Sequence, residues 1–203
     1  MNFAPSPASL LALALAVAPL TAGAVEPPPT PSPTPALSPG VKADMIVWIE
    51  DAEKKLLDLA TATPDAKFTW RPAKGVRSVA EVYGHVIGAN YNLPAKAGVK
   101  PPESFDPKAV DKLTKKAEIV TALRESFAHA KKALADTPDA ALDKPIDLFG
   151  NKSTVRGVYL LVLAHGQEHL GQSIAYARAN NITPPWTERR AAKAEGAKAE
   201  AKK

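Results

Sequence analysis

The chain contains no cysteine among its 203 residues. This absence excludes disulfide bonds, a thiolate nucleophile and a metal site with cysteine ligands. Aromatic residues make up only 6% of the chain, and no stripe of basic residues alternates with them, although the net charge is +5. Nucleic-acid-binding surfaces usually show such a stripe, so we expect no nucleic-acid partner.

The chain also lacks a hydrophobic run long enough for a membrane-spanning helix. The N-terminal run LLALALAVAPL is short and interrupted by proline. It is followed by small residues that end at Ala22-Gly23-Ala24, a pattern typical of a signal-peptide cleavage site. We therefore predict a signal peptide over residues 1–24. The mature protein is expected to be periplasmic or secreted, with no membrane attachment after cleavage.

Composition divides the rest of the chain into three parts. Residues 25–39 are dense in proline, which predicts an extended linker. Residues 188–203 are charged and rich in alanine, with no apolar face, and predict a disordered tail or a frayed helix. Between them, residues 40–187 are numerous enough to form one domain with its own hydrophobic core.

Four segments of this domain carry apolar residues at helical spacing, at about 40–60, 78–93, 108–135 and 153–180. Ser78 and Glu81 form the pattern of a capping box at the start of the second helix, and Pro94 ends or kinks it. No segment alternates convincingly as a strand does. The sequence therefore predicts an all-α protein, an up-and-down four-helix bundle.

Two of the four histidines lie in the stretch AHGQEHLGQ of the fourth helix. His165 and His169 occupy its apolar stripe, which continues with Gln172 and Tyr176. Burying such polar groups without partners costs about 1–3 kcal/mol each. The two imidazoles must therefore find partners in each other, in water or in a metal ion.

A third histidine can complete a metal site. His85 lies at the edge of the apolar stripe of the second helix, beside Gly84 and near Gly88. Three nitrogens that converge from two helices match catalytic zinc sites, in which three protein ligands leave a position open. Nickel, iron and manganese fit as well, so the sequence predicts a divalent ion of undetermined identity. His129 lies away from the apolar stripe of its helix and is predicted to be a surface residue outside the site.

Two other interpretations of the histidines remain open. They can be core residues that hydrogen-bond without any metal. In addition, HGQEH matches the H-x-x-E-H motif of inverted zinc proteases, with Glu168 as general base. That motif needs a further carboxylate ligand downstream, and the only acids after His169 lie in the charged tail. We interpret Glu168 as a solvated residue or as a hydrogen-bond acceptor for His165.

Two longer stretches carry a resemblance to a known family. FTWRPAKGVRSVAEVYGHVIGANY and LVLAHGQEHLGQSIAYARANNITPPWTE resemble the second and fourth helices of the DinB-like (DinB/YfiT-like) superfamily of metal-binding four-helix bundles. The resemblance implies that His85, His165 and His169 are metal ligands and that two bundles pair as a homodimer. Characterised relatives include S-transferases and isomerases that use small thiols, whereas many members have no known activity.

Two hypotheses for the function follow. One is an exported metal-dependent transferase or hydrolase acting on a small molecule, with Asn92, Gln172 and Tyr176 as substrate-binding residues. The other is an exported bundle that binds a metal or ligand without catalysis. A general base beside the metal would distinguish the enzyme from the binding protein.

Overall fold

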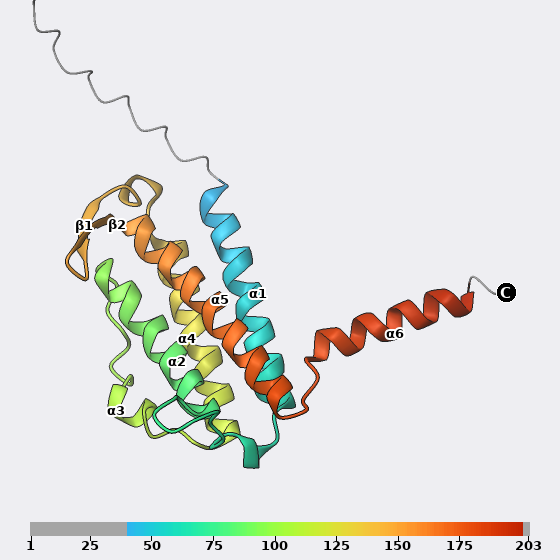
Figure 1. Ribbon diagram of the computed structural model, residues 1–203. Coiled ribbons are helices and arrows are strands. Elements are labelled where there is room, and N and C mark those ends of the chain that lie inside the picture. Colours follow the sequence, from blue (N-terminus) through green and yellow to red (C-terminus); the bar gives the residue numbers. More distant parts are fainter. Residues whose placement is uncertain (1–39, 201–203) are drawn as a thin grey trace, which may run out of the picture. The chain divides into compact units, whose positions relative to one another are not determined.

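A computed structural model describes residues 40–200 of the chain (Figure 1). The predicted signal peptide and proline-rich linker lie outside the described residues. The helices of this part are α1 Val41–Ala62, α2 Val79–Lys96, α3 Pro107–Val110, α4 Lys116–Asp136, α5 Val155–Ala179 and α6 Pro185–Glu200. Two short strands, β1 Pro145–Leu148 and β2 Asn151–Thr154, precede α5. Across residues 40–200, no helix combines the length and the apolar character needed to cross a membrane.

Helices α1, α2, α4 and α5 form a four-helix bundle, so the predicted all-α bundle is confirmed (Figure 1). α1 packs against α4 and α5, and α2 packs against the same two helices. α1 and α2 therefore lie at diagonally opposite corners of the bundle. α4 and α5 occupy the two corners between α1 and α2.

The order of the helices differs from the simple up-and-down order that we predicted. Asn90 of α2 donates to Ser126 of α4, and Gly98, just beyond the C-terminal end of α2, lines one hollow with Asp136 at the C-terminal end of α4. α2 and α4 are thus parallel neighbours, whereas neighbours in an up-and-down bundle are antiparallel. The long connection of residues 97–115 brings the chain back to the end of the bundle where α2 began.

The third predicted helix, residues 108–135, is not continuous. It is divided into the single turn α3 and the long helix α4, with residues 111–115 between them. Val110 at the end of α3 packs against α2 at Gly84, where an added Cβ would lie 3.3 Å from the Val110 carbonyl oxygen. This contact holds α3 against α2, and such tertiary packing overrides a helical pattern in the sequence.

The hairpin β1–β2 was missed by the sequence analysis. Its strands are antiparallel and have only four residues each, which is too short for a clear alternation. Phe149 and Gly150 form the two-residue turn with φ angles of 56° and 82°. Both angles are positive, as the tight turns of such hairpins require.

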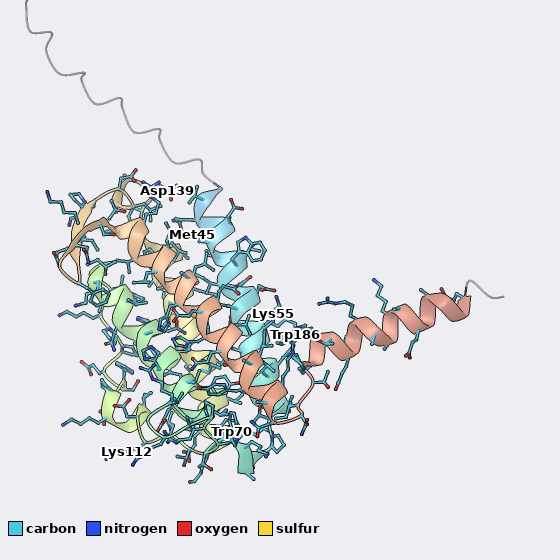
Figure 2. The ribbon with its side chains drawn as sticks, in the orientation of Figure 1. Met45, Lys55, Trp70, Lys112, Asp139 and Trp186 are labelled. Carbon is cyan, nitrogen blue, oxygen red and sulfur yellow. The ribbon has the colours of Figure 1, made fainter. Side chains whose placement is uncertain are left out.

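The core lies between the four long helices and is built mainly from apolar residues that recur at helical spacing. Met45, labelled in Figure 2, is buried, as are Ile49, Leu56, Leu123 and Phe127. The largest fully buried side chains in the described residues also include Tyr83, Tyr159 and Phe68. Burial of each large apolar side chain contributes about 1.5–3 kcal/mol, and this packing fixes the helices that carry the histidines.

Of the two alternatives given for the charged C-terminal segment, a disordered tail or a frayed helix, the described part as far as Glu200 is helical. α6 begins at Pro185, before the predicted boundary, and reaches Glu200. Proline suits the first turn of a helix, and the following alanine, glutamate and lysine residues have high helix propensity. Arg189 forms an ion pair with Asp58 of α1 at 2.9 Å, but the side chains of residues 187–197 are exposed.

Candidate metal centre

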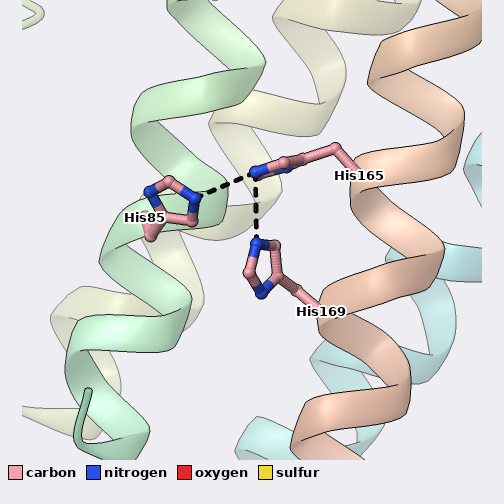
Figure 3. Close-up of side chains that lie close together, drawn as sticks. All are labelled: His85, His165 and His169. Carbon is pink, nitrogen blue, oxygen red and sulfur yellow. Dashed lines mark hydrogen bonds between the residues drawn. The ribbon is translucent and has the colours of Figure 1, made fainter. Parts of the chain in front are cut away.

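Three histidines converge between α2 and α5 (Figure 3). His165 Nε2 lies 3.0 Å from His85 Nε2 and 3.2 Å from His169 Nε2. The nearest ring nitrogens of all three lie within 4.8 Å of one another, and no other group of three possible ligands was found in residues 40–200. The structure therefore brings together the three residues predicted as ligands.

Local features of the sequence position these rings. The predicted capping box is present: Ser78 Oγ accepts from the Glu81 backbone N–H at 3.3 Å, and Glu81 accepts from the Ser78 N–H at 2.7 Å. This box fixes the start of α2 two turns before His85. On α5, Gly166 lies next to His165 and faces α1, where an added Cβ would make an ordinary van der Waals contact with Ala52 at 3.6 Å.

The three rings are buried to different extents. His169 is buried, whereas His85 and His165 are partly buried. Desolvation, followed by the charges of His169, His85 and Arg77, lowers the pKa of His165 to about 4. Desolvation and then Arg77 and His169 also lower the pKa of His85. His165 is therefore neutral at neutral pH and His85 favours its neutral form, which is the form that binds metal ions.

A chain of hydrogen bonds determines the tautomer of His169. The Tyr176 hydroxyl donates to the backbone carbonyl of Arg77 at 3.1 Å, because a carbonyl can only accept. The hydroxyl oxygen then accepts from the Gln172 amide N–H at 3.1 Å, and this leaves Gln172 Oε1 to accept from His169 Nδ1 at 2.8 Å. The proton of the neutral ring is on Nδ1, so Nε2 presents a lone pair to His165.

With His169 in this tautomer, the three neutral rings cannot form a hydrogen bond across both of their Nε2 contacts. The contact between His165 and His169 needs the proton on His165 Nε2, since His169 Nε2 has none. This single N–H is then used for His169, so the contact between His165 Nε2 and His85 Nε2 has no donor. A proton placed on His85 Nε2 would point at the N–H of His165 instead of at a lone pair. No arrangement of neutral rings satisfies both contacts. A divalent cation among the three nitrogens would satisfy them, and imidazole ligands suit zinc, nickel and iron.

A cavity of about 530 Å³ opens beside the cluster. Its walls are mostly apolar and come from α2, α3, the β-hairpin and α5. The lining residues are Gly84, His85, Gly88, Ala89, Asn92, Leu93, Lys96, Pro107, Val110, Asp111, Phe149, Leu161 and His165. A site of this size that combines apolar walls with a few polar groups is typical of small-molecule binding.

Only one of the three predicted substrate-binding residues lies at this cavity. Asn92 lines the cavity, whereas Gln172 and Tyr176 do not. The latter two support His169 from behind, and Tyr176 also packs edge-to-face on Trp70, labelled in Figure 2, at 5.4 Å between ring centres. They are thus placed to orient the His169 ring rather than to contact a molecule in the cavity.

Several cavity or cluster residues were missed by the sequence analysis, among them Asp111, Phe149 and Arg77. Asp111 and Phe149 line the cavity, and Arg77 Nη2 lies 3.4 Å from His85 Nδ1. Arg77 directly precedes the capping residue Ser78, which was a signal for its place near the first turn of α2. Asp111 and Phe149 gave no usable signal, because they lie in a break and a turn that were not predicted.

The carboxylates around the cluster differ in how free they are to act. Glu168 is exposed and has no hydrogen bond to the histidines in the described structure, which does not favour the inverted-protease interpretation. Glu81 is bound to Arg71 and to the Ser78 N–H. Asp111 is the only acidic residue that lines the cavity.

His129 lies outside the cluster but is not the surface residue that we predicted. Its ring is partly buried and stacks on Tyr91, with 5.0 Å between ring centres. Its Nε2 atom is buried and has no hydrogen-bond partner among residues 40–200, and desolvation lowers the pKa of this histidine. The prediction failed because α4 packs against both α1 and α2. The buried surface of α4 is therefore wider than the apolar stripe counted from the sequence.

Comparison with known families identifies one family whose model covers both the bundle and the three histidines. A family model described as the DinB superfamily matches residues 49–173, a span that contains all three histidines of the cluster. The chain belongs to the DinB superfamily. No curated protein is similar enough to the chain to count as a match.

Solved structures of low sequence identity share the fold. A DinB-like protein from Bacillus cereus ATCC 10987 is 18% identical, with a TM-score of 0.62, and the match covers 70% of this chain and 95% of that one. YfiT from Bacillus subtilis is 16% identical, with a TM-score of 0.59, and the match covers 75% and 94%. YfiT is described as a probable metal-dependent hydrolase with an unusual four-helix bundle topology.

Proposed function

We propose that His85, His165 and His169 bind one divalent metal ion through their Nε2 atoms, and that the site is that of a metal-dependent hydrolase or transferase for a small molecule. The observation that carries the proposal is the bare Nε2 of His169, which faces His165 Nε2 at 3.2 Å beside an open cavity. The description of YfiT as a probable metal-dependent hydrolase supports the hydrolytic reaction.

The bound ion would act as a Lewis acid that polarises a carbonyl or phosphoryl oxygen. His85 and His165 line the cavity and His169 does not. A substrate would therefore approach from the side of the first two histidines, opposite to the Gln172 support. Three protein ligands leave such a position open in catalytic sites.

The remaining roles fall to residues that line the cavity. The Asp111 carboxylate is exposed and has no ion-pair partner within the described chain, so it is free to accept a proton during the reaction. The Asn92 amide can donate and accept hydrogen bonds to orient a polar group of the substrate. Leu93, Leu161 and Phe149 would hold an apolar part of it and exclude water.

The proposal includes export and self-association. Cleavage after residue 24 would release the protein to the periplasm or the medium, away from cytosolic thiols, so hydrolysis is preferred to thiol transfer. Val47 and Trp48 of α1 and Leu160 of the neighbouring α5 are large apolar side chains with 59%, 57% and 47% of their surface exposed. These residues support a homodimer, because exposed apolar surface favours protein contacts.

The test begins with metal analysis of the purified protein and reconstitution with zinc, nickel, iron or manganese. The reconstituted protein is then assayed on esters and amides with short apolar groups. We expect one equivalent of metal and hydrolysis that is lost in Asp111→Asn with the metal content unchanged. Absence of stoichiometric metal would refute the metal site. Equal hydrolysis by wild type and Asp111→Asn would refute the role of Asp111.

A further inference from the structure

Arg77 creates a conflict of donors behind His85 once a metal is bound. Its Nη2 atom lies 3.4 Å from His85 Nδ1, and a guanidinium can only donate hydrogen bonds. Without metal, His85 Nδ1 accepts from it. A metal on Nε2 needs the lone pair of that atom, so the proton of the neutral ring must then be on Nδ1. Two N–H donors then face each other with no acceptor between them.

No carboxylate or carbonyl of residues 40–200 accepts a hydrogen bond from Arg77 Nη2 or His85 Nδ1. Histidines that bind metals almost always donate their second N–H to a carboxylate, a carbonyl or water. Glu81, the acid nearest in sequence, is bound to Arg71 at 2.9 Å and to the Ser78 N–H at 2.7 Å. Arg77 itself takes part in no ion pair among residues 40–200.

The space beside these donors is open. A hollow of about 300 Å³ is lined by Arg77, Glu81, Gly84, His85, Val110 and Asp111. It shares four of these residues with the larger cavity at the cluster, namely Gly84, His85, Val110 and Asp111. A molecule that enters the cavity can therefore place one end in the hollow. Glu81 is neutralised by its ion pair with Arg71. Arg77, Lys96 and the ion outweigh the remaining charge of Asp111, so the two spaces together favour an anion.

The opposite end of the cavity is apolar apart from Lys96 and includes an unfavourable backbone conformation. Phe149 has a φ of 56° and its side chain is 65% exposed at the hairpin turn. A left-handed conformation in a bulky residue costs about 1 kcal/mol or more, and such costs are typical of functional sites. Phe149 nevertheless places its ring at the cavity, near Lys96 at 5.5 Å and among lining residues that include Leu161.

We propose that the site binds a small organic carboxylate whose oxygens accept from Arg77 Nη2 and His85 Nδ1 and whose apolar chain lies in the cavity towards Phe149. This assignment rests on the proposed metal site and defines its substrate class as anionic and partly apolar. A planar carboxylate matches the fork of an arginine, which binds it through two parallel hydrogen bonds. Arg77 is thus a residue that determines specificity.

The test is calorimetric binding of acetate, hexanoate and neutral 1-hexanol to the zinc-loaded protein. Hexanoate should bind more tightly than acetate, by about threefold to fourfold for each added methylene that is buried. Arg77→Gln should weaken both carboxylates by about 10- to 100-fold, as expected for a hydrogen bond between charged groups, and leave 1-hexanol unchanged. Arg124→Gln is the matched control, since this exposed guanidinium of α4 lines neither the cavity nor the hollow.

Zinc content is measured first in each variant, so that the two proposals can fail separately. Wild-type protein that does not bind zinc refutes both. One equivalent of zinc together with equal carboxylate affinity in Arg77→Gln and Arg124→Gln overturns the carboxylate site and leaves the metal site intact. Carboxylate binding that appears in Asp111→Asn but not in the wild type would also overturn the carboxylate site. In that case the Asp111 carboxylate would be the acceptor for Arg77 and His85 in the wild type. Phe149→Ala should weaken hexanoate but not acetate, and equal loss for both would contradict the proposed orientation.

Discussion

His169 Nδ1 donates to Gln172 Oε1 at 2.8 Å, and this bond directs the lone pair of His169 Nε2 towards the other two histidines. Gln172 is one turn further along α5 and is itself held by the Tyr176 hydroxyl. The Arg77 backbone carbonyl can only accept, and it therefore sets the direction of donation in this series of hydrogen bonds. A metal-binding tautomer is therefore prepared by residues that do not touch the proposed ion.

Replacing Gln172 should weaken metal binding without removing a ligand. Gln172→Leu removes the acceptor for His169 Nδ1, and loss of such a supporting group typically costs 10- to 100-fold in metal affinity. Gln172→Glu keeps an acceptor and should stay near the wild-type affinity. Zinc affinity measured by competition with a chelating indicator provides the test.

The matched control for this prediction is Gln167→Leu, on the same helix. Gln167 bonds to the backbone of Trp48 in α1 and not to the histidines. Its replacement should leave zinc affinity unchanged. If Gln172→Leu and Gln167→Leu bind zinc equally well, the hydrogen-bond chain does not orient His169.

Removal of single histidines should separate the cluster from His129. Alanine at His85, His165 or His169 is expected to lower metal content well below one equivalent, whereas His129→Ala should retain it. Chelation should lower the melting temperature of the wild type, because an ion that binds only the folded state stabilises it. Metal analysis and melting curves of the folded fractions check both points. Full metal content in the His165→Ala/His169→Ala double mutant would refute the site.

The metal-free protein should lose stability as the pH falls through the range in which the unfolded chain takes up protons. The pKa of His165 falls from 6.5 to about 4 on folding, so between these values the unfolded state binds more protons than the folded state. Stability is therefore complete above pH 6.5 and decreases until about pH 4. We expect a loss of about 2 kcal/mol, because partial exposure of the ring reduces the full effect.

Urea unfolding at pH 7.5, 5.5 and 4 in the presence of a chelator measures this loss. His165→Gln removes the titrating ring and should show a smaller loss over the same range. His85 contributes in the same direction, since its pKa is also lowered, so the variant should not become independent of pH. Identical pH profiles for wild type and His165→Gln would contradict the assignment.

The spacing of residues predicted those parts of the structure that depend on a single helix. His165 and His169 lie one turn apart on α5, so their common direction follows from helix geometry alone. The capping box at Ser78 depends only on local contacts and is present as predicted. Four apolar stripes likewise predicted four long helices.

Features that depend on how helices pack could not be predicted in this way. The parallel pairing of α2 with α4 requires the long connection of residues 97–115, and the length of a connection does not determine its path. His129 was misplaced because one stripe was counted on a helix that has two neighbours. Asp111 and Phe149 reach the cavity from a break and a turn that tertiary contacts create, so their place became evident only in the structure.

The two glycines on either side of His85 should respond differently to alanine. An added Cβ at Gly88 meets nothing within 4 Å, so Gly88→Ala should gain about 0.5–1 kcal/mol of stability from helix propensity. At Gly84 the Cβ would lie 3.3 Å from the Val110 carbonyl oxygen, so α3 must shift and Gly84→Ala should gain less or lose stability. Denaturant unfolding of both variants measures the difference. Equal stabilisation would mean that α3 does not pack closely on α2, and that Asp111, which follows Val110, is not held beside His85.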